Sequence, residues 1–168
     1  LTTVVADFQT AGRGQRGNSW ESEDGKNLMF SFVLYPTFLE ARKQFLLSQI
    51  ASLAVKETLD LYIGDVSIKW PNDIYWKDKK ICGMLIENDL MGIHISQSIA
   101  GVGININQKE FHSSAPNPIS IIQITHRESD RMEILAQVLQ RIKEYYKILQ
   151  EGDIEFITDR YQAALFRK

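Results

Sequence analysis

A loop near the start of the sequence combines residue types that bind a phosphate or a carboxylate. Residues 12–17 read GRGQRG, and Trp20 follows three positions later. Glycines let backbone N–H groups approach an anion closely, and arginines form forked, charge-assisted hydrogen bonds to it. The loop is not a P-loop, because it lacks a terminal Gly-Lys-Ser/Thr. Its glycines have the G-x-G-x-x-G spacing of a dinucleotide fingerprint, but the loop leads to a predicted strand and does not open a helix. We expect a small anionic ligand here, with a solvated turn as the alternative.

A second stretch, KWPND at residues 69–73, places a lysine at the end of an apolar strand. Pro71 restricts its own backbone and that of the residue before it, so the corner should be rigid. A lysine at such an edge tends to point into a cleft. The alternative is a surface lysine followed by an Asn-Asp turn.

Glycines also interrupt two predicted strands. Gly83 lies within KKICGMLIE (79–87), and Gly101 and Gly103 lie beside two asparagines in GVGININ (101–107). A glycine inside a strand usually marks a bulge or the close approach of another group. A small ligand lying against the sheet would explain the three together, whereas sheet packing would explain any one of them.

The remaining reactive side chains give no site of their own. His94, His112 and His126 lack the spacing of metal ligands, so we expect no protein-held metal. Cys82 is expected to pack inside a strand rather than to act as a nucleophile.

The elements that must position these residues follow from hydrophobic periodicity and turn signals. We predict an α+β fold with a mixed β-sheet backed by helices on one face. Strands are expected at 1–8 (buried), 28–36, 66–70, 92–107 and twice within 73–89 around a turn at 77–80. Helices are expected at 38–62, 130–150 and 153–166, with Ser129 or Asp130 and then Asp153 as N-caps, and a polar loop at 108–118.

Composition limits the class of protein. The 168 residues suit one domain, with 44% apolar and 24% charged residues. A net charge of −2 gives no general attraction to nucleic acid or to an anionic membrane. The single cysteine rules out an internal disulfide and favours a reducing compartment. With no apolar run of membrane-spanning length, we expect a cytoplasmic protein without nucleic-acid or membrane partners.

In their order and separations, GRGQRGNSW, KWPND, KKICGMLIE and GVGININ resemble the catalytic domain of biotin protein ligases. The resemblance implies the fold shared by biotin and lipoate protein ligases and class II aminoacyl-tRNA synthetases. It implies an enzyme that joins biotin to ATP as biotinyl-5′-AMP, with Mg²⁺, and releases pyrophosphate. Biotin would then pass to one lysine of the biotin carboxyl carrier domain of a carboxylase. A homodimer is a further possibility within the family.

The resemblance also implies a role for each matching residue. Lys69 and Arg16 would be catalytic, acting on the charge that develops between the biotin carboxylate and the α-phosphate. The chain departs from the family at Gln15, where many members carry arginine, so we expect a missing or weaker phosphate contact. Biotin would be bound by Gln9, Gly12, Arg13, Gly14, Gln15, Lys69 and Gly83, and the nucleotide by Arg13, Gln15, Arg16, Trp20, Asn72 and Lys80.

The resemblance leads us to expect that residues 1–168 form a catalytic domain. The family's upstream Ser-Thr-Asn segment, its small downstream domain and the DNA-binding domain of some members would lie outside it. A lipoate–protein ligase is the nearest alternative, but its Ser-Gly-Gly-Gly loop is absent. The other alternative is a non-catalytic biotin-binding domain, which would have no need for Lys69 and Arg16 at the reacting carboxylate.

Overall fold

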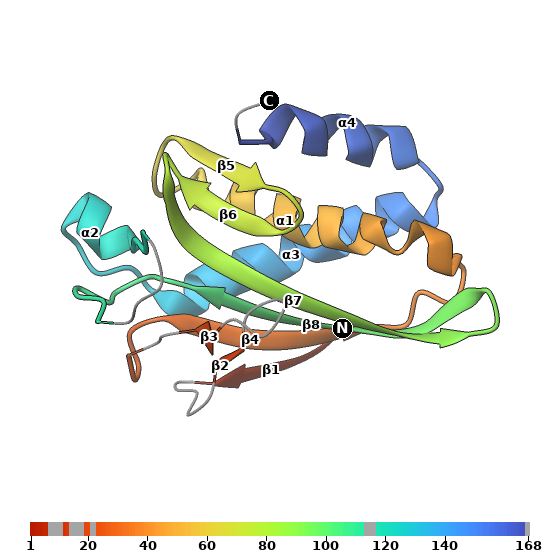
Figure 1. Ribbon diagram of the computed structural model, residues 1–168, viewed down its shortest axis with the longest axis horizontal. Coiled ribbons are helices and arrows are strands. Elements are labelled where there is room, and N and C mark those ends of the chain that lie inside the picture. Colours follow the sequence, from red (N-terminus) through yellow and green to blue (C-terminus); the bar gives the residue numbers. More distant parts are fainter. Residues whose placement is uncertain (7–11, 14–18, 21–22, 113–116, 167–168) are drawn as a thin grey trace.

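An antiparallel sheet forms the centre of the protein (Figure 1). The computed structural model describes residues 1–6, 12–13, 19–20, 23–112 and 117–166, with only the backbone described at 12, 13, 19 and 20. The six strands lie in the order β1-β4-β8-β7-β6-β5. Their bounds are β1 Thr2–Ala6, β4 Leu28–Leu34, β5 Val66–Lys69, β6 Asp73–Trp76, β7 Lys79–Met91 and β8 His94–Ile104. Every ladder between these strands is antiparallel, and the described residues pair in parallel only at two isolated bridges, Ile68–Leu165 and Lys80–Pro118.

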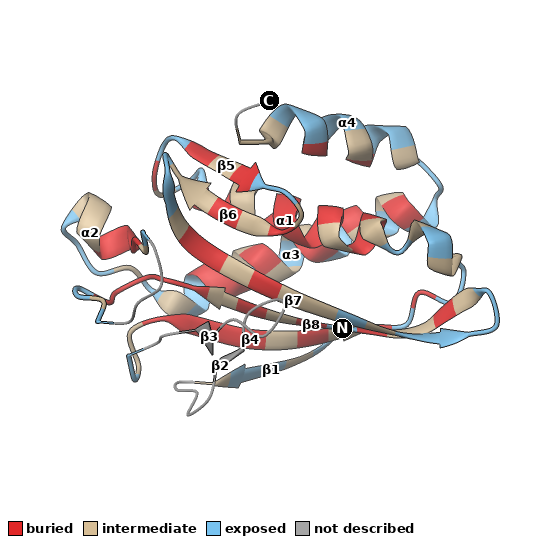
Figure 2. Ribbon diagram, viewed as in Figure 1, coloured by how far each residue is buried: buried red, intermediate tan, exposed pale blue. Residues whose placement is uncertain are grey.

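Three helices cover one face of the sheet, which confirms the α+β prediction. Alternate residues of the strands point toward them, because side chains along a strand alternate between its two faces. The buried positions on that face include Leu28, Phe30, Phe32, Ile68, Ile74, Cys82, Val102 and Ile104. In Figure 2, buried stretches alternate with less buried ones along the strands and recur on the helices packed against them.

The helix predictions were largely confirmed, with differences at the ends. Helix α3 spans Arg131–Gln150 and α4 spans Ile154–Ala164, and the N-caps are the carboxylates of Asp130 and Asp153. The helix predicted at 38–62 is a 3₁₀ turn, Ala41–Lys43, followed by α1, Phe45–Leu59. Phe38 and Leu61 therefore lie outside α1, and both are exposed. Apolar residues at helical spacing continue past both ends of α1, so the prediction from this spacing overestimated the length of the helix.

A short helix, α2 (Ile121–Thr125), was not predicted. Its five residues are too few to show helical periodicity. The signal that could have found it is the capping box: Ser120 Oγ accepts from the Gln123 N–H, and the Gln123 side chain accepts from the Ser120 N–H.

The prediction that residues 1–8 form a buried strand was wrong about burial. Strand β1 is a sheet edge that pairs only with β4, and it is pale along much of its length in Figure 2. Val4 is 66% exposed and Val5 39%. β-Branched residues favour a strand, but they do not decide whether it lies at the centre or the edge of a sheet.

Polar groups join the three helices beneath the core. The Tyr145 hydroxyl of α3 lies 2.8 Å from both carboxylate oxygens of Glu57 in α1, and Arg160 of α4 donates to that hydroxyl at 3.3 Å. Burial, with the Glu57 carboxylate next in importance, raises the pKa of Tyr145 to about 12. This cluster fixes the helix layer that supports the sheet.

No helix among the described residues is long and apolar enough to cross a bilayer.

Candidate functional site

One row of residues crosses the sheet on the face away from the helices. Lys69 of β5 pairs with Asp73 of β6, and extending the pair Ile74–Cys82 by one residue puts Asp73 opposite Gly83 of β7. Gly83 pairs with Gly103 of β8, which also pairs with Met29 of β4. The row therefore has two glycines at its centre and a lysine at one end, and a glycine inside a strand usually marks a bulge or the close approach of another group.

The next row repeats this arrangement with a third glycine. Gly101 pairs with Leu85 on one side and Ser31 on the other. A Cβ at Gly101 would meet only Leu85 O and Ser31 Oγ, both at 3.9 Å, so the fold itself does not require glycine there. The three glycines predicted to share a ligand-facing surface thus lie on the same face of the sheet.

Lys69 ends β5 with an exposed side chain that contacts an aromatic residue. Its Nζ donates to the Tyr75 hydroxyl at 3.3 Å and lies 4.9 Å from the centre of the Tyr75 ring. No carboxylate of the described residues lies within ion-pair distance of this Nζ. No acid of the described residues therefore neutralises the positive charge of Lys69.

The acid directly across from Lys69 has another partner. Asp73 Oδ2 lies 3.4 Å from the Nζ of Lys80, which reaches it from β7. Lys69, Asp73 and Lys80 together carry a net charge of +1 on this corner of the sheet. Such a corner attracts an anion locally, although the whole chain has a net charge of −2.

The corner between β5 and β6 is held from behind by α4. The buried Tyr161 donates its hydroxyl proton to the Pro71 carbonyl at 2.6 Å, and the ring of Phe45 packs edge-on against Tyr161. Asn72 is buried, and its Oδ1 accepts no hydrogen bond within the described residues. Gln49, Asn88 and Asn105 each have a buried amide oxygen without a donor as well, so this feature alone does not assign Asn72 to a ligand.

The asparagines of GVGININ have structural roles that the sequence did not indicate. Asn105 Nδ2 donates to the Ile119 carbonyl at 3.1 Å. Asn107 exchanges two hydrogen bonds with the Ser129 backbone, at 3.0 and 2.9 Å. They tie down the loops that follow β8, so only the glycines of this motif remain associated with the ligand face.

Two buried amides missed in the sequence fix the same region. Asn27 donates to the Gln108 Oε1 at 2.7 Å and accepts from the Ile106 N–H at 2.8 Å. Gln108 Oε1 also accepts from the Glu23 N–H at 3.0 Å. These bonds join the chain before β4 to the chain after β8 across 79 to 85 positions, a pairing that no local sequence pattern encodes.

The glycine-arginine loop is described only in part. Gly12–Arg13 (β2) and Ser19–Trp20 (β3) pair as a separate two-stranded ribbon, and Figure 1 draws it beside β1 and β4, away from the helices. The structure thus brings Lys69, Asn72, Lys80 and Gly83 together. Gln9, Gly14, Gln15 and Arg16, and the side chains of Arg13 and Trp20, lie outside what the structure describes, so convergence of that loop on Lys69 stays a prediction.

Cys82 packs in the core as predicted. It is fully buried, and burial raises the pKa of its thiol well above the usual range, which keeps it protonated and unreactive. Among the described residues, no three His, Cys, Asp or Glu side chains group closely enough to hold a metal ion.

Comparison with known proteins gives consistent matches. The model of the Biotin/lipoate A/B protein ligase family matches residues 1–105. The bifunctional ligase/repressor BirA of Bacillus spizizenii is 32% identical over 152 residues, covering 87% of this chain and 46% of that protein. The biotin–[acetyl-CoA-carboxylase] ligase of Paracoccus denitrificans is 33% identical over 141 residues, covering 79% and 57%.

Among solved structures, the biotin protein ligase from Aquifex aeolicus in complex with biotin and ATP superimposes with a TM-score of 0.85 at 34% identity. That match covers 98% of this chain and 68% of the other. The chain spans about half the length of the curated relatives it matches.

Proposed function

The chain belongs to the biotin/lipoate A/B protein ligase family, and from this premise we propose that it activates biotin with ATP and transfers it to a carrier-protein lysine. The names of its relatives support biotin as the substrate, and the Aquifex aeolicus structure contains both biotin and ATP. The observation that carries the proposal is Lys69, an unneutralised cation at the end of a glycine-lined row on the ligand face.

The chemistry needs no protein nucleophile. An oxygen of the biotin carboxylate attacks the α-phosphorus of ATP, the α–β phosphoanhydride bond breaks, and pyrophosphate leaves. The amine of the carrier lysine then attacks the acyl carbon of biotinyl-5′-AMP, which releases AMP. Negative charge accumulates between the carboxylate and the α-phosphate in the first step, where a fixed cation such as Lys69 stabilises the transition state.

The other residues would bind and orient the two substrates. We assign Gln9, Gly12, Arg13, Gly14, Gln15 and Gly83 to biotin with Lys69, and Arg13, Gln15, Arg16, Trp20, Asn72 and Lys80 to the nucleotide. Arg16 would act with Lys69 on the reacting phosphate. The exposed position of Lys69, beside Asn72 in the KWPND corner, supports this division for the described part of the site.

Magnesium fits this site as part of the ATP complex. Mg²⁺ binds ATP phosphates and keeps several waters, so it needs few protein oxygens. Asn72 and Asp73 supply amide and carboxylate oxygens at this corner, and the carboxylate of Asp73 is already paired with Lys80. Asn72 would therefore contact the ion or the nucleotide, and the ion would supply charge neutralisation for the leaving pyrophosphate.

The acceptor would be the biotin carboxyl carrier domain of a carboxylase, and the cytoplasm would be the compartment.

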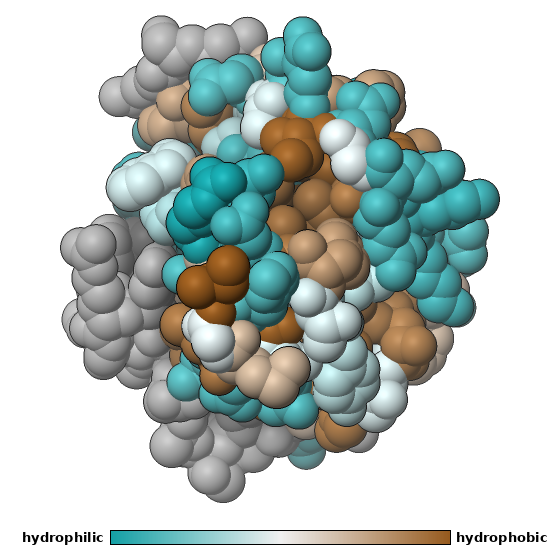
Figure 3. All heavy atoms as spheres, turned by 90° about the vertical axis from the view of Figure 1, so that its right-hand side faces the viewer, coloured by the Kyte–Doolittle hydropathy of each residue, from teal (hydrophilic) through white to brown (hydrophobic). Residues whose placement is uncertain are grey.

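A homodimer stays a prediction. Figure 3 looks onto the end of the molecule that carries the β7–β8 turn, where apolar residues gather at the surface. Leu90, Met91 and Ile93 are exposed there. Sedimentation velocity across a concentration series would measure whether the chain self-associates.

Pyrophosphate release from Mg·ATP tests the proposal, with biotin and lipoate compared in parallel. We expect release with biotin and only background release with lipoate. A preference for lipoate would favour the lipoate–protein ligase alternative. Biotin binding by calorimetry with no ATP-dependent pyrophosphate would favour the non-catalytic binding domain.

A further inference from the structure

We propose that Tyr75 is a positioning residue for Lys69, and that Phe166, at the end of α4, supports Tyr75 in this role. The inference rests on the proposed function only where it predicts the rate of biotinyl-5′-AMP formation. The arrangement itself can be tested without turnover.

The register of the β5–β6 hairpin places Tyr75 within reach of Lys69. Lys69 lies opposite Asp73, and Tyr75 lies opposite Ser67, so Lys69 and Tyr75 form a diagonal pair on one face. Diagonal neighbours are close enough for an aromatic and a long side chain to touch. Here the ammonium makes both contacts that a tyrosine offers, a hydrogen bond to the hydroxyl and a cation–π contact with the ring.

A neutral partner suits a cation that must act on an anion. An exposed lysine has many rotamers, and ordering it costs conformational entropy that a substrate would otherwise have to offset. A carboxylate could order Lys69 as well, but it would cancel the charge. Asp73 is the natural candidate, yet it is paired with Lys80, which leaves Tyr75 to orient Lys69 with its charge intact.

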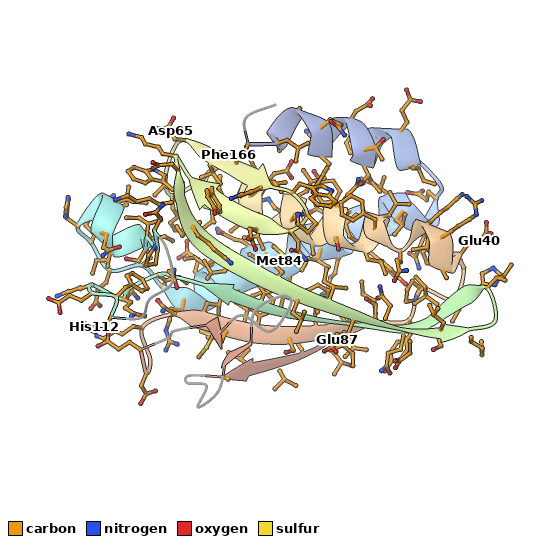
Figure 4. The ribbon with its side chains drawn as sticks, viewed as in Figure 1. Glu40, Asp65, Met84, Glu87, His112 and Phe166 are labelled. Atoms are coloured by element: carbon orange, nitrogen blue, oxygen red, sulfur yellow. The ribbon has the colours of Figure 1, made fainter. Side chains whose placement is uncertain are left out.

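The segment that directly follows α4 contacts both Tyr75 and the strand that carries Lys69. Leu165 forms a parallel bridge with Ile68, and the Phe166 N–H donates to the Ile68 carbonyl at 2.7 Å. The Phe166 ring then lies 5.3 Å from the Tyr75 ring at an interplanar angle of 47°. Figure 4 shows Phe166 beside the β5–β6 hairpin. Leu165 and Phe166 thus hold the backbone of Ile68, the residue before Lys69. Phe166 also contacts the Tyr75 ring, which in turn contacts Lys69.

Substitutions at Tyr75 separate its two contacts. Tyr75→Phe keeps the ring and loses the hydrogen bond, whereas Tyr75→Leu loses both. In single-turnover formation of biotinyl-5′-AMP, we expect Tyr75→Leu to slow the step about tenfold, since misplacing a reacting group can cost up to roughly a hundredfold. We expect Tyr75→Phe and Phe166→Leu to slow it about two- to threefold, with KM for ATP nearly unchanged in all three.

A double-mutant cycle distinguishes positioning from a general structural role. If Tyr75 acts through Lys69, Tyr75→Leu should have no further effect in a Lys69→Ala background. Trp76→Leu is the matched control, because Trp76 neighbours Tyr75 on β6 and forms a cation–π contact with Lys77 instead. It should leave the rate unchanged. An equal loss from Tyr75→Leu in both backgrounds would overturn the proposal.

The NMR spectrum of ¹³C-lysine-labelled protein tests the geometry directly. The ring of Tyr75 should shift the terminal methylene protons of Lys69 upfield, in the parent and in Tyr75→Phe but not in Tyr75→Leu. Absence of this shift in the folded parent would refute the contact. If the shift is present but the parent forms no adenylate from biotin, the proposed function fails while the positioning of Lys69 stands.

Discussion

Lys69 is the residue on which the proposed chemistry depends most, because its charge is exposed, oriented and not neutralised by a described acid. Lys69→Ala should slow adenylation far more than it weakens ATP binding, since a preorganised cation acts mainly on charge that develops in the transition state. Loss of one such contact commonly costs about 3 kcal/mol, or roughly a hundredfold in rate. Lys69→Arg should restore little, because the guanidinium distributes its charge over a plane.

Single-turnover pyrophosphate release, with nucleotide binding measured separately, checks this expectation. Lys77→Ala is the control, since Lys77 is an exposed lysine in the turn between β6 and β7 that contacts Trp76. A Lys69→Ala rate within a few-fold of the parent would assign the lysine a structural role.

Sequence reasoning identified some residues of this site and missed others for a physical reason. Lys69, Asn72 and Gly83 stand out by their types and by the motifs that contain them. Tyr75 lies outside these motifs, and Asp73, although it ends KWPND, received no role, because their contacts with Lys69 and Lys80 depend on the register of three strands. A single sequence contains the strands but not the register between them.

Among the elements, β7 and β8 carry glycines that leave part of one sheet face without side chains. Gly101→Ala should change the free energy of unfolding by less than about 1 kcal/mol, because a Cβ meets only ordinary contacts there and strand interiors disfavour glycine. If biotin lies against this face, the added methyl should nevertheless weaken its binding several-fold. Calorimetric titration with biotin and urea denaturation measure the two effects. Unchanged affinity would place the ligand away from the Gly101 row.

The connections around β4 and β8 depend on one buried amide. Asn27→Ala would leave the Ile106 N–H and the Gln108 Oε1 without this partner, so the free energy of unfolding should fall by about 1–3 kcal/mol. Asn88→Ala is the control, since among the described residues Asn88 makes one side-chain hydrogen bond, an exposed one to Gln44, and its Oδ1 has no partner to lose. Urea unfolding of both variants checks this. Equal losses would show that the Asn27 bonds contribute nothing specific.

The order and type of most elements could be predicted, because periodicity and capping residues act locally. Asp130 and Asp153 cap α3 and α4 as expected. What failed depended on tertiary context: the edge position of β1, the ends of α1 and the short helix α2. The joins made by Asn27 and Gln108 lie beyond local reasoning because their partners are distant in sequence.

For the whole molecule, the tyrosines of the helix layer predict how stability depends on alkaline pH. Burial raises the pKa of Tyr62, Tyr145 and Tyr161 to about 12 each, against a value near 10 in the unfolded chain. Below pH 10 both states keep these protons, so their contribution is complete. Between about pH 10 and 12 the unfolded state loses them first, and the free energy of unfolding must fall as pH rises.

Tyr145→Phe isolates one part of this dependence. At pH 7 the variant should be less stable by about 1–2 kcal/mol, because the hydroxyl that donates to Glu57 and accepts from Arg160 is lost. Above pH 10 the parent loses that advantage while the variant has no phenol to ionise there, so the two stabilities should converge toward pH 12. Urea denaturation at intervals from pH 7 to pH 11 follows this convergence. Tyr35→Phe, at an exposed position, should run parallel to the parent, and a Tyr145→Phe curve that also runs parallel would show that ionisation of Tyr145 is not coupled to folding.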